Sequence, residues 1–117
     1  GLESLVNETS AFWDGIEVKK EFVHGYDWNQ VINSNLRFNL GSCTVEKEDG
    51  TYVLITDPQS LPTTWNRDNY YQARLFLTAY KENQNPELRK VLFSYLKELY
   101  DMQKQDGGWG RSHFRTK

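Results

Sequence analysis

Two stretches with apolar residues at helical spacing, separated by only three residues, constrain the fold of this chain most. The first stretch covers about residues 68–82, and its apolar face is formed by Tyr70, Ala73, Phe76, Leu77 and Tyr80. The second covers about residues 86–104, and its broader stripe is formed by Leu88, Val91, Leu92, Tyr95, Leu96 and Leu99. Asn85 followed by Pro86 is a helix start signal, because a capping side chain precedes proline at the first helical position. The short connector therefore predicts an antiparallel helical hairpin.

The middle of the chain, about residues 35–56, predicts a three-stranded antiparallel meander. Leu36, Phe38 and Leu40 alternate with polar residues, as in a strand with one buried and one wet face. After a turn at residues 41–42, two further runs flank an Asp-Gly pair at residues 49–50. Asp-Gly between alternating runs is a strong hairpin signal.

The N-terminal segment from Leu2 to Trp13 has helical spacing and predicts a helix that Gly15 would end. Asp27 is a good N-cap for a short helix running through Ile32. Residues 16–23 fit either a strand or a helix, and 57–64 read as a loop.

The fold prediction is a single α+β domain over residues 1–117. Its meander packs with an N-terminal helix and a C-terminal helical hairpin in two layers. A chain of 117 residues fits one domain of ordinary size, and aromatic residues make up 15% of it.

The cysteine count and the hydropathy of the chain bear on disulfides, localisation and membrane spans. Cys43 is the single cysteine, so the chain has no intrachain disulfide, and its place at a strand start predicts a buried core residue. A single cysteine is compatible with the cytoplasm. The chain begins at Gly1 rather than Met, so a removed signal segment stays open as an alternative. No apolar stretch is long enough to predict a membrane span.

Charge is distributed unevenly along the chain. The formal net charge is −2, but residues 1–85 carry a net of −5 and residues 86–117 a net of +3. Residues 111–117 are predicted to form a basic tail. The overall negative charge makes nucleic acid an unlikely partner, because phosphate contacts dominate such binding.

The sequence shows no arrangement of side chains typical of catalysis or metal binding. Cys43 and the two histidines lack both a third orienting group and the spacing of known metal sites. We therefore predict no cofactor and no metal, and favour a protein without catalytic activity.

One motif stands out, the run QKQDGGWG at residues 103–110, which follows the helical hairpin. With the hairpin, from about Tyr71 to Gly110, it resembles one repeat of the α/α-toroid families, which include terpene cyclases, protein prenyltransferases and some polysaccharide lyases. In those families the Gln, Gly and Trp close each helix pair and are structural. The resemblance covers about a third of the chain. We interpret the segment as a local way of ending the helix, in which the glycines release the helix and Trp109 folds back onto it. A toroid needs several hairpins, and the predicted meander has no place in one.

The aromatic residues provide the candidate binding site. Trp65, Tyr71 and Trp109, together with Arg111 and Arg115, have the composition of a protein interface. The favoured function is a small, non-catalytic binding module of inhibitor or adaptor type that acts through protein–protein contacts. One alternative is a carbohydrate- or small-ligand-binding domain that uses Trp65 and Trp109. Another is a fragment of an α/α-toroid enzyme. The partner and the oligomeric state stay open.

Overall fold

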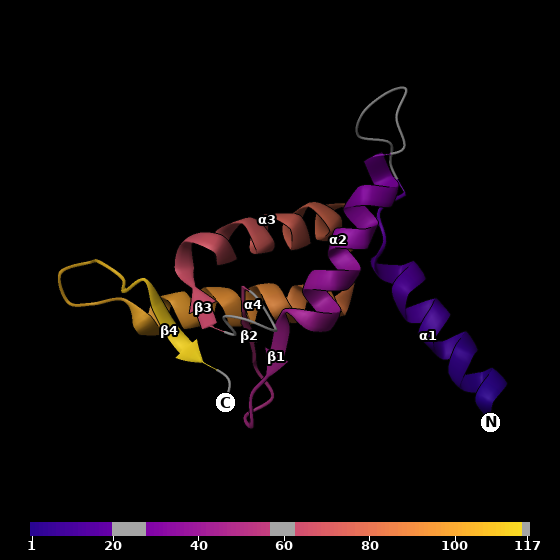
Figure 1. Ribbon diagram of the computed structural model, residues 1–117, viewed down its shortest axis with the longest axis horizontal. Coiled ribbons are helices and arrows are strands. Elements are labelled where there is room, and N and C mark those ends of the chain that lie inside the picture. The colour runs from indigo at the N-terminus through magenta and orange to yellow at the C-terminus, as the bar shows by residue number, and fades with distance from the viewer. Residues whose placement is uncertain (20–27, 57–62, 116–117) are drawn as a thin grey trace.

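The computed structural model describes residues 1–19, 28–56 and 63–115 and has a mostly helical α+β architecture (Figure 1). The elements in chain order are α1 (Leu2–Ile16), α2 (Trp28–Ser42), β1 (Thr44–Glu46), β2 (Tyr52–Leu54), β3 (Thr63–Trp65), α3 (Asn66–Asn83), α4 (Pro86–Met102) and β4 (Ser112–Arg115). The described strands form two antiparallel pairs, β1 with β2 and β3 with β4.

The predicted helical hairpin is present as α3 and α4, which lie side by side in Figure 1. Asn85 caps α4, since its side chain accepts a hydrogen bond from the Glu87 amide at 2.8 Å, and Pro86 stands at the first helical position. Gln84 adopts a left-handed conformation, with φ of 55°, and its amide donates to the Tyr80 carbonyl. These local contacts end α3 and start α4 within three residues.

The prediction of a first meander strand is wrong, because residues 35–42 belong to α2. Ile32, Leu36 and Leu40 are four residues apart, so they share one helical face, which packs on the core. Phe38 lies off that face and is 52% exposed. The short helix predicted after Asp27 is therefore the beginning of a longer one, and Asp27 itself lies outside the described residues.

The predicted hairpin around Asp49 and Gly50 is confirmed. β1 pairs with β2, with Val45 opposite Val53. Gly50 has a φ of 83°, which glycine adopts without steric cost. The Asp49 carboxylate accepts hydrogen bonds from the hydroxyl and the amide of Thr51, at 2.6 and 2.9 Å, and these bonds lower the pKa of Asp49.

The second strand pair, β3 with β4, was not predicted from the sequence. Thr63 lies opposite Arg115 and Trp65 opposite Ser112, with an irregularity between them. Residues of the predicted basic tail therefore include a strand, while Lys117 lies outside the described residues. The last two residues of the predicted loop over 57–64 belong to β3, which begins at Thr63. Residues 57–62 lie outside the described part of the chain.

The core lies where one face of the α3–α4 hairpin meets the end of α1, one face of α2, and β2. Its buried side chains are Ile16, Val18, Leu36, Leu54, Ala73, Phe76, Ala79, Leu88 and Val91. Cys43 is also buried, as predicted. None of the described helices is both long and apolar enough to cross a membrane.

Helix α1 is predicted correctly but ends at Ile16, and it points away from the rest of the molecule (Figure 1). Two amide side chains at the junction of α3 and α4 hold its C-terminal end. Asn83 Nδ2 donates to the Ile16 carbonyl at 2.7 Å, and Asn85 Nδ2 donates to the Gly15 carbonyl at 3.1 Å. Beyond the helix, Val18 exchanges two backbone hydrogen bonds with the Asn33 side chain. Of residues 16–23, those from 20 onward lie outside the described part.

Candidate functional site

A groove of about 330 Å³ runs between α3 and α4 on a second face of the hairpin. Its apolar walls are formed by Tyr70 and Leu77 of α3 and by Leu92, Tyr95, Leu96 and Leu99 of α4. The stripe on α4 is broad enough to supply both faces, because Leu88 and Val91 point into the core while Leu92, Leu96 and Leu99 line the groove. The hairpin is thus apolar on two sides.

Three of the apolar side chains that line the groove are exposed to solvent. Leu96 is 56% exposed, Tyr70 47% and Leu77 37%. Contiguous exposed apolar surfaces are typical of interaction sites in general, whereas single exposed apolar residues are ordinary. The sequence analysis did not identify this groove.

Two polar features lie in the groove. Arg74 Nη1 donates to the Tyr70 hydroxyl at 2.9 Å, and its guanidinium carbon lies 5.8 Å from the centre of the Tyr70 ring. Burial raises the pKa of Tyr95, so this phenol is neutral at ordinary pH. Among the described residues that line the groove there is one charged side chain, that of Arg74, and it is basic.

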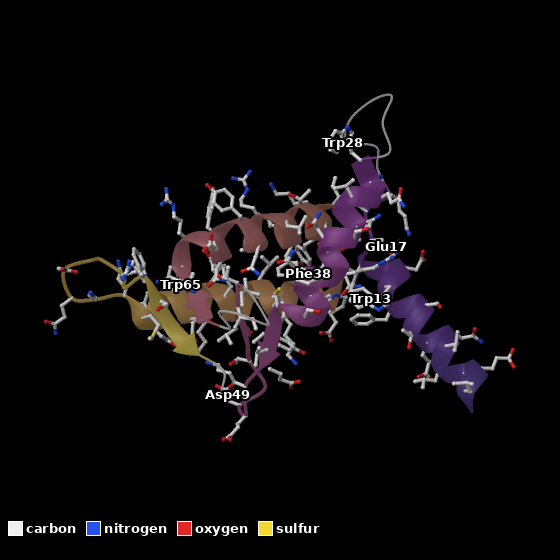
Figure 2. All side chains as sticks on the ribbon, in the orientation of Figure 1. Trp13, Glu17, Trp28, Phe38, Asp49 and Trp65 are labelled. Carbon is white, nitrogen blue, oxygen red and sulfur yellow. The ribbon has the colours of Figure 1, made fainter. Side chains whose placement is uncertain are left out.

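The structure places the five sequence-predicted binding residues in different settings. Trp65 ends β3 at the start of α3, far from Trp28 at the start of α2 (Figure 2). Backbone pairing brings Trp65 beside Ser112, and the Asn66 amide donates to the Arg111 carbonyl at 2.9 Å. Trp65 and Arg111 are therefore close in the fold.

Tyr71 and Arg115 complete the predicted set. Tyr71 is 67% exposed on α3, and its ring packs edge-to-face with that of Tyr70, at a centroid separation of 5.2 Å. It lines an open hollow with Thr78 and with Arg74, which also lines the groove. The backbone of Arg115 pairs with Thr63 in β4.

Trp109 folds back onto α4, as the motif at residues 103–110 predicts. Its indole Nε1 donates to the Leu99 carbonyl at 2.7 Å, although the side chain stays 45% exposed. Gln103 Nε2 donates to the Gly107 carbonyl at 2.8 Å, and Gly107 has a φ of 89°. The Lys104 amide donates to the Gly108 carbonyl at 2.8 Å. These bonds close the end of the helix.

A second hollow, of about 450 Å³, is lined by three basic side chains of α4, and each of them contacts another side chain. The guanidinium carbon of Arg89 lies 5.1 Å from the centre of the Phe93 ring. The Nζ atom of Lys90 lies 5.1 Å from the centre of the Tyr52 ring. Lys97 Nζ is 2.6 Å from the Asp101 carboxylate. Within the described ranges, no group of three or more His, Cys, Asp and Glu side chains could hold a metal ion.

The groove was missed because apolar periodicity does not say which face is covered. The signal that could have found it is the breadth of the α4 stripe, together with Tyr70 and Leu77 on α3. A stripe that wide exceeds what the core contact uses, and the described part of the chain buries one side of it.

Comparison with protein-family models, with curated proteins and with solved structures finds no match for this chain.

Proposed function

We propose that this chain is a small binding module that acts through protein–protein contacts, with the α3–α4 groove as its binding surface. The observation that carries the proposal is the exposure of Leu77 and Leu96 on a hairpin whose other face already fills the core. When a partner removes exposed leucines from water, the complex is stabilised by about 25 cal/mol per Å² of buried apolar surface.

The shape of the groove favours a helix as the partner. Two antiparallel helices leave an elongated hollow between them, and such a hollow accepts the apolar face of an amphipathic helix with anchors at positions i, i+3, i+4 and i+7. Arg74 contributes the groove's charge. A matching helix therefore carries an acidic residue beside its apolar stripe.

The experiment is a selection of amphipathic helical peptides against the chain, followed by affinity measurement by fluorescence anisotropy. Leu96→Glu places a charge in the groove and should weaken binding by about tenfold or more. Phe38→Glu is the matched control, because Phe38 is 52% exposed on α2, outside the groove, against 56% for Leu96. Selected peptides that bind the wild-type and Leu96→Glu chains equally would refute the proposal.

A second function, an α/α-toroid element, is favoured by the bonds that close α4. The contacts of Trp109 with Leu99 and of Gln103 with Gly107 fit the structural role that the resemblance gives to these residue types. On this alternative, helices of further hairpins cover the groove. The isolated chain would expose the face that those helices cover, so it should precipitate at concentrations where Leu96→Glu stays in solution. The carbohydrate-binding alternative stays a prediction.

A further inference from the structure

The most exposed apolar stripe outside the groove lies on α1. Leu2, Leu5, Val6 and Phe12 fall on one helical face, and their exposed fractions are 78%, 59%, 53% and 41%. Trp13 and Ile16, at the other end of the helix, pack on the chain's own core. The first three turns of α1 thus present an amphipathic surface that is exposed to solvent within one copy.

We propose that α1 of a second copy of this chain occupies the α3–α4 groove. The inference rests on the proposed function of the groove and names its partner. Leu2 and Phe12 are ten residues apart, which spans about 15 Å along a helix, and the groove residues Leu92 to Leu99 span about 10 Å. The stripe therefore covers the full length of the groove wall with about one turn to spare.

Charge supports the same pairing. Helix α1 contains Glu3, Glu8 and Asp14 and no lysine or arginine. Glu3 and Glu8 flank the apolar stripe on either side, and the charged residue that lines the groove is Arg74. The acidic flanks also make an anionic lipid surface a poor alternative, because helices that bind such surfaces are rich in lysine and arginine.

The geometry makes the contact intermolecular. The C-terminal end of α1 is bonded to the α3–α4 connector through Asn83 and Asn85, and the helix points away from α3 and α4 (Figure 1). Its own groove is therefore out of reach of Leu2 and Leu5. Two copies that exchange α1 reciprocally make two identical contacts and close a two-fold dimer.

The first measurement is light scattering during size exclusion over a range of concentrations. The wild-type chain should shift from monomer to dimer as concentration rises. Leu5→Glu and Leu96→Glu should each remain monomeric, while Asn7→Glu, on the opposite face of α1, should dimerise as the wild type does. A wild-type chain that stays monomeric throughout would overturn the inference.

Disulfide trapping identifies the contact. Leu5→Cys chains, isotopically labelled for mass, are mixed with unlabelled Leu96→Cys chains under mild oxidation, with wild type as the background for the buried Cys43. The mixed dimer should form in about tenfold greater yield than with Asn7→Cys in place of Leu5→Cys. Equal yields, or a dominant dimer of two Leu96→Cys chains, would overturn the inference.

The two proposals fail separately. A monomeric chain whose groove still binds selected peptides, in a manner lost in Leu96→Glu, refutes the α1 exchange and leaves the proposed function standing. A chain that neither traps α1 nor binds a peptide refutes both.

Discussion

The two faces of the α3–α4 hairpin are both lined by apolar side chains but differ in burial. The core face, with Phe76, Leu88 and Val91, is almost completely buried against α1, α2 and β2. The groove face also carries leucines, but Leu77 and Leu96 there are 37% and 56% exposed. An apolar residue type therefore does not by itself show whether a helix face is buried in the core or exposed to solvent.

The largest expected difference between the faces is in stability. Phe76→Ala should lower the free energy of unfolding by about 3–5 kcal/mol, because it removes a fully buried ring and leaves a cavity. Leu96→Ala should change it by less than about 0.5 kcal/mol. Urea denaturation at low protein concentration measures both. A comparable loss for Leu96→Ala in dilute solution would show that the groove is covered within one copy.

The next effect tests the connector that holds both faces in place. Asn85→Ala removes the cap of α4 and the bond to the Gly15 carbonyl, and should cost about 1–2 kcal/mol of unfolding free energy. Asn35→Ala is the matched control, since that side chain is exposed and bonds only within its own helix, to the Val31 carbonyl. It should leave stability unchanged or slightly higher. Thermal denaturation followed by circular dichroism makes the comparison, and equal losses would contradict it.

Ion pairs on α4 give a smaller contrast. Lys47 Nζ lies 3.0 Å from the Glu98 carboxylate, where the side chains are 29% and 19% exposed, whereas the side chains of Lys97 and Asp101 are 68% and 49% exposed. Glu98→Gln should cost about 1 kcal/mol and Asp101→Asn about 0.3 kcal/mol. Raising the salt concentration should weaken mainly the second pair. A larger loss for Asp101→Asn in urea denaturation would reverse this ranking of the two environments.

The smallest effect concerns pH at the groove wall. Burial raises the pKa of Tyr95, so its contribution to stability is present below the unfolded value of about 10 and is lost as pH rises through the folded value. Tyr95→Phe should therefore flatten the decline of stability above about pH 10. Tyr52→Phe offers a comparison on β2, because burial raises the pKa of that phenol too. An unchanged decline in Tyr95→Phe would contradict the assignment.

Sequence reasoning succeeded where the signals are local. The Asn85–Pro86 start, the Asp49–Gly50 turn and the fold-back of Trp109 each depend on residues close in the chain. It failed at residues 35–42, because Leu36 and Leu40 fit both the strand period and the helix period, and the deciding contact of Ile32 with the core is not visible in a short window.

Features that depend on distant partners were missed. The pairing of Thr63 with Arg115 joins the strand that precedes the helical hairpin in the sequence to the strand that follows it. No local sequence pattern determines the register of that pair. The groove required knowledge of which face of α4 the rest of the chain covers. The five predicted binding residues stay predictions, with Trp65 and Arg111 now placed side by side through β3 and β4.

Because α1 is anchored at its C-terminal end, a small rotation there displaces its N-terminal end by a larger distance. Its fifteen residues extend about 22 Å from the two asparagine bonds at Gly15 and Ile16. A rotation of about 10° about that end moves Leu2 by about 4 Å, which is about three quarters of the pitch of the helix. Small adjustments at two amide side chains therefore set where the far tip of the helix can reach.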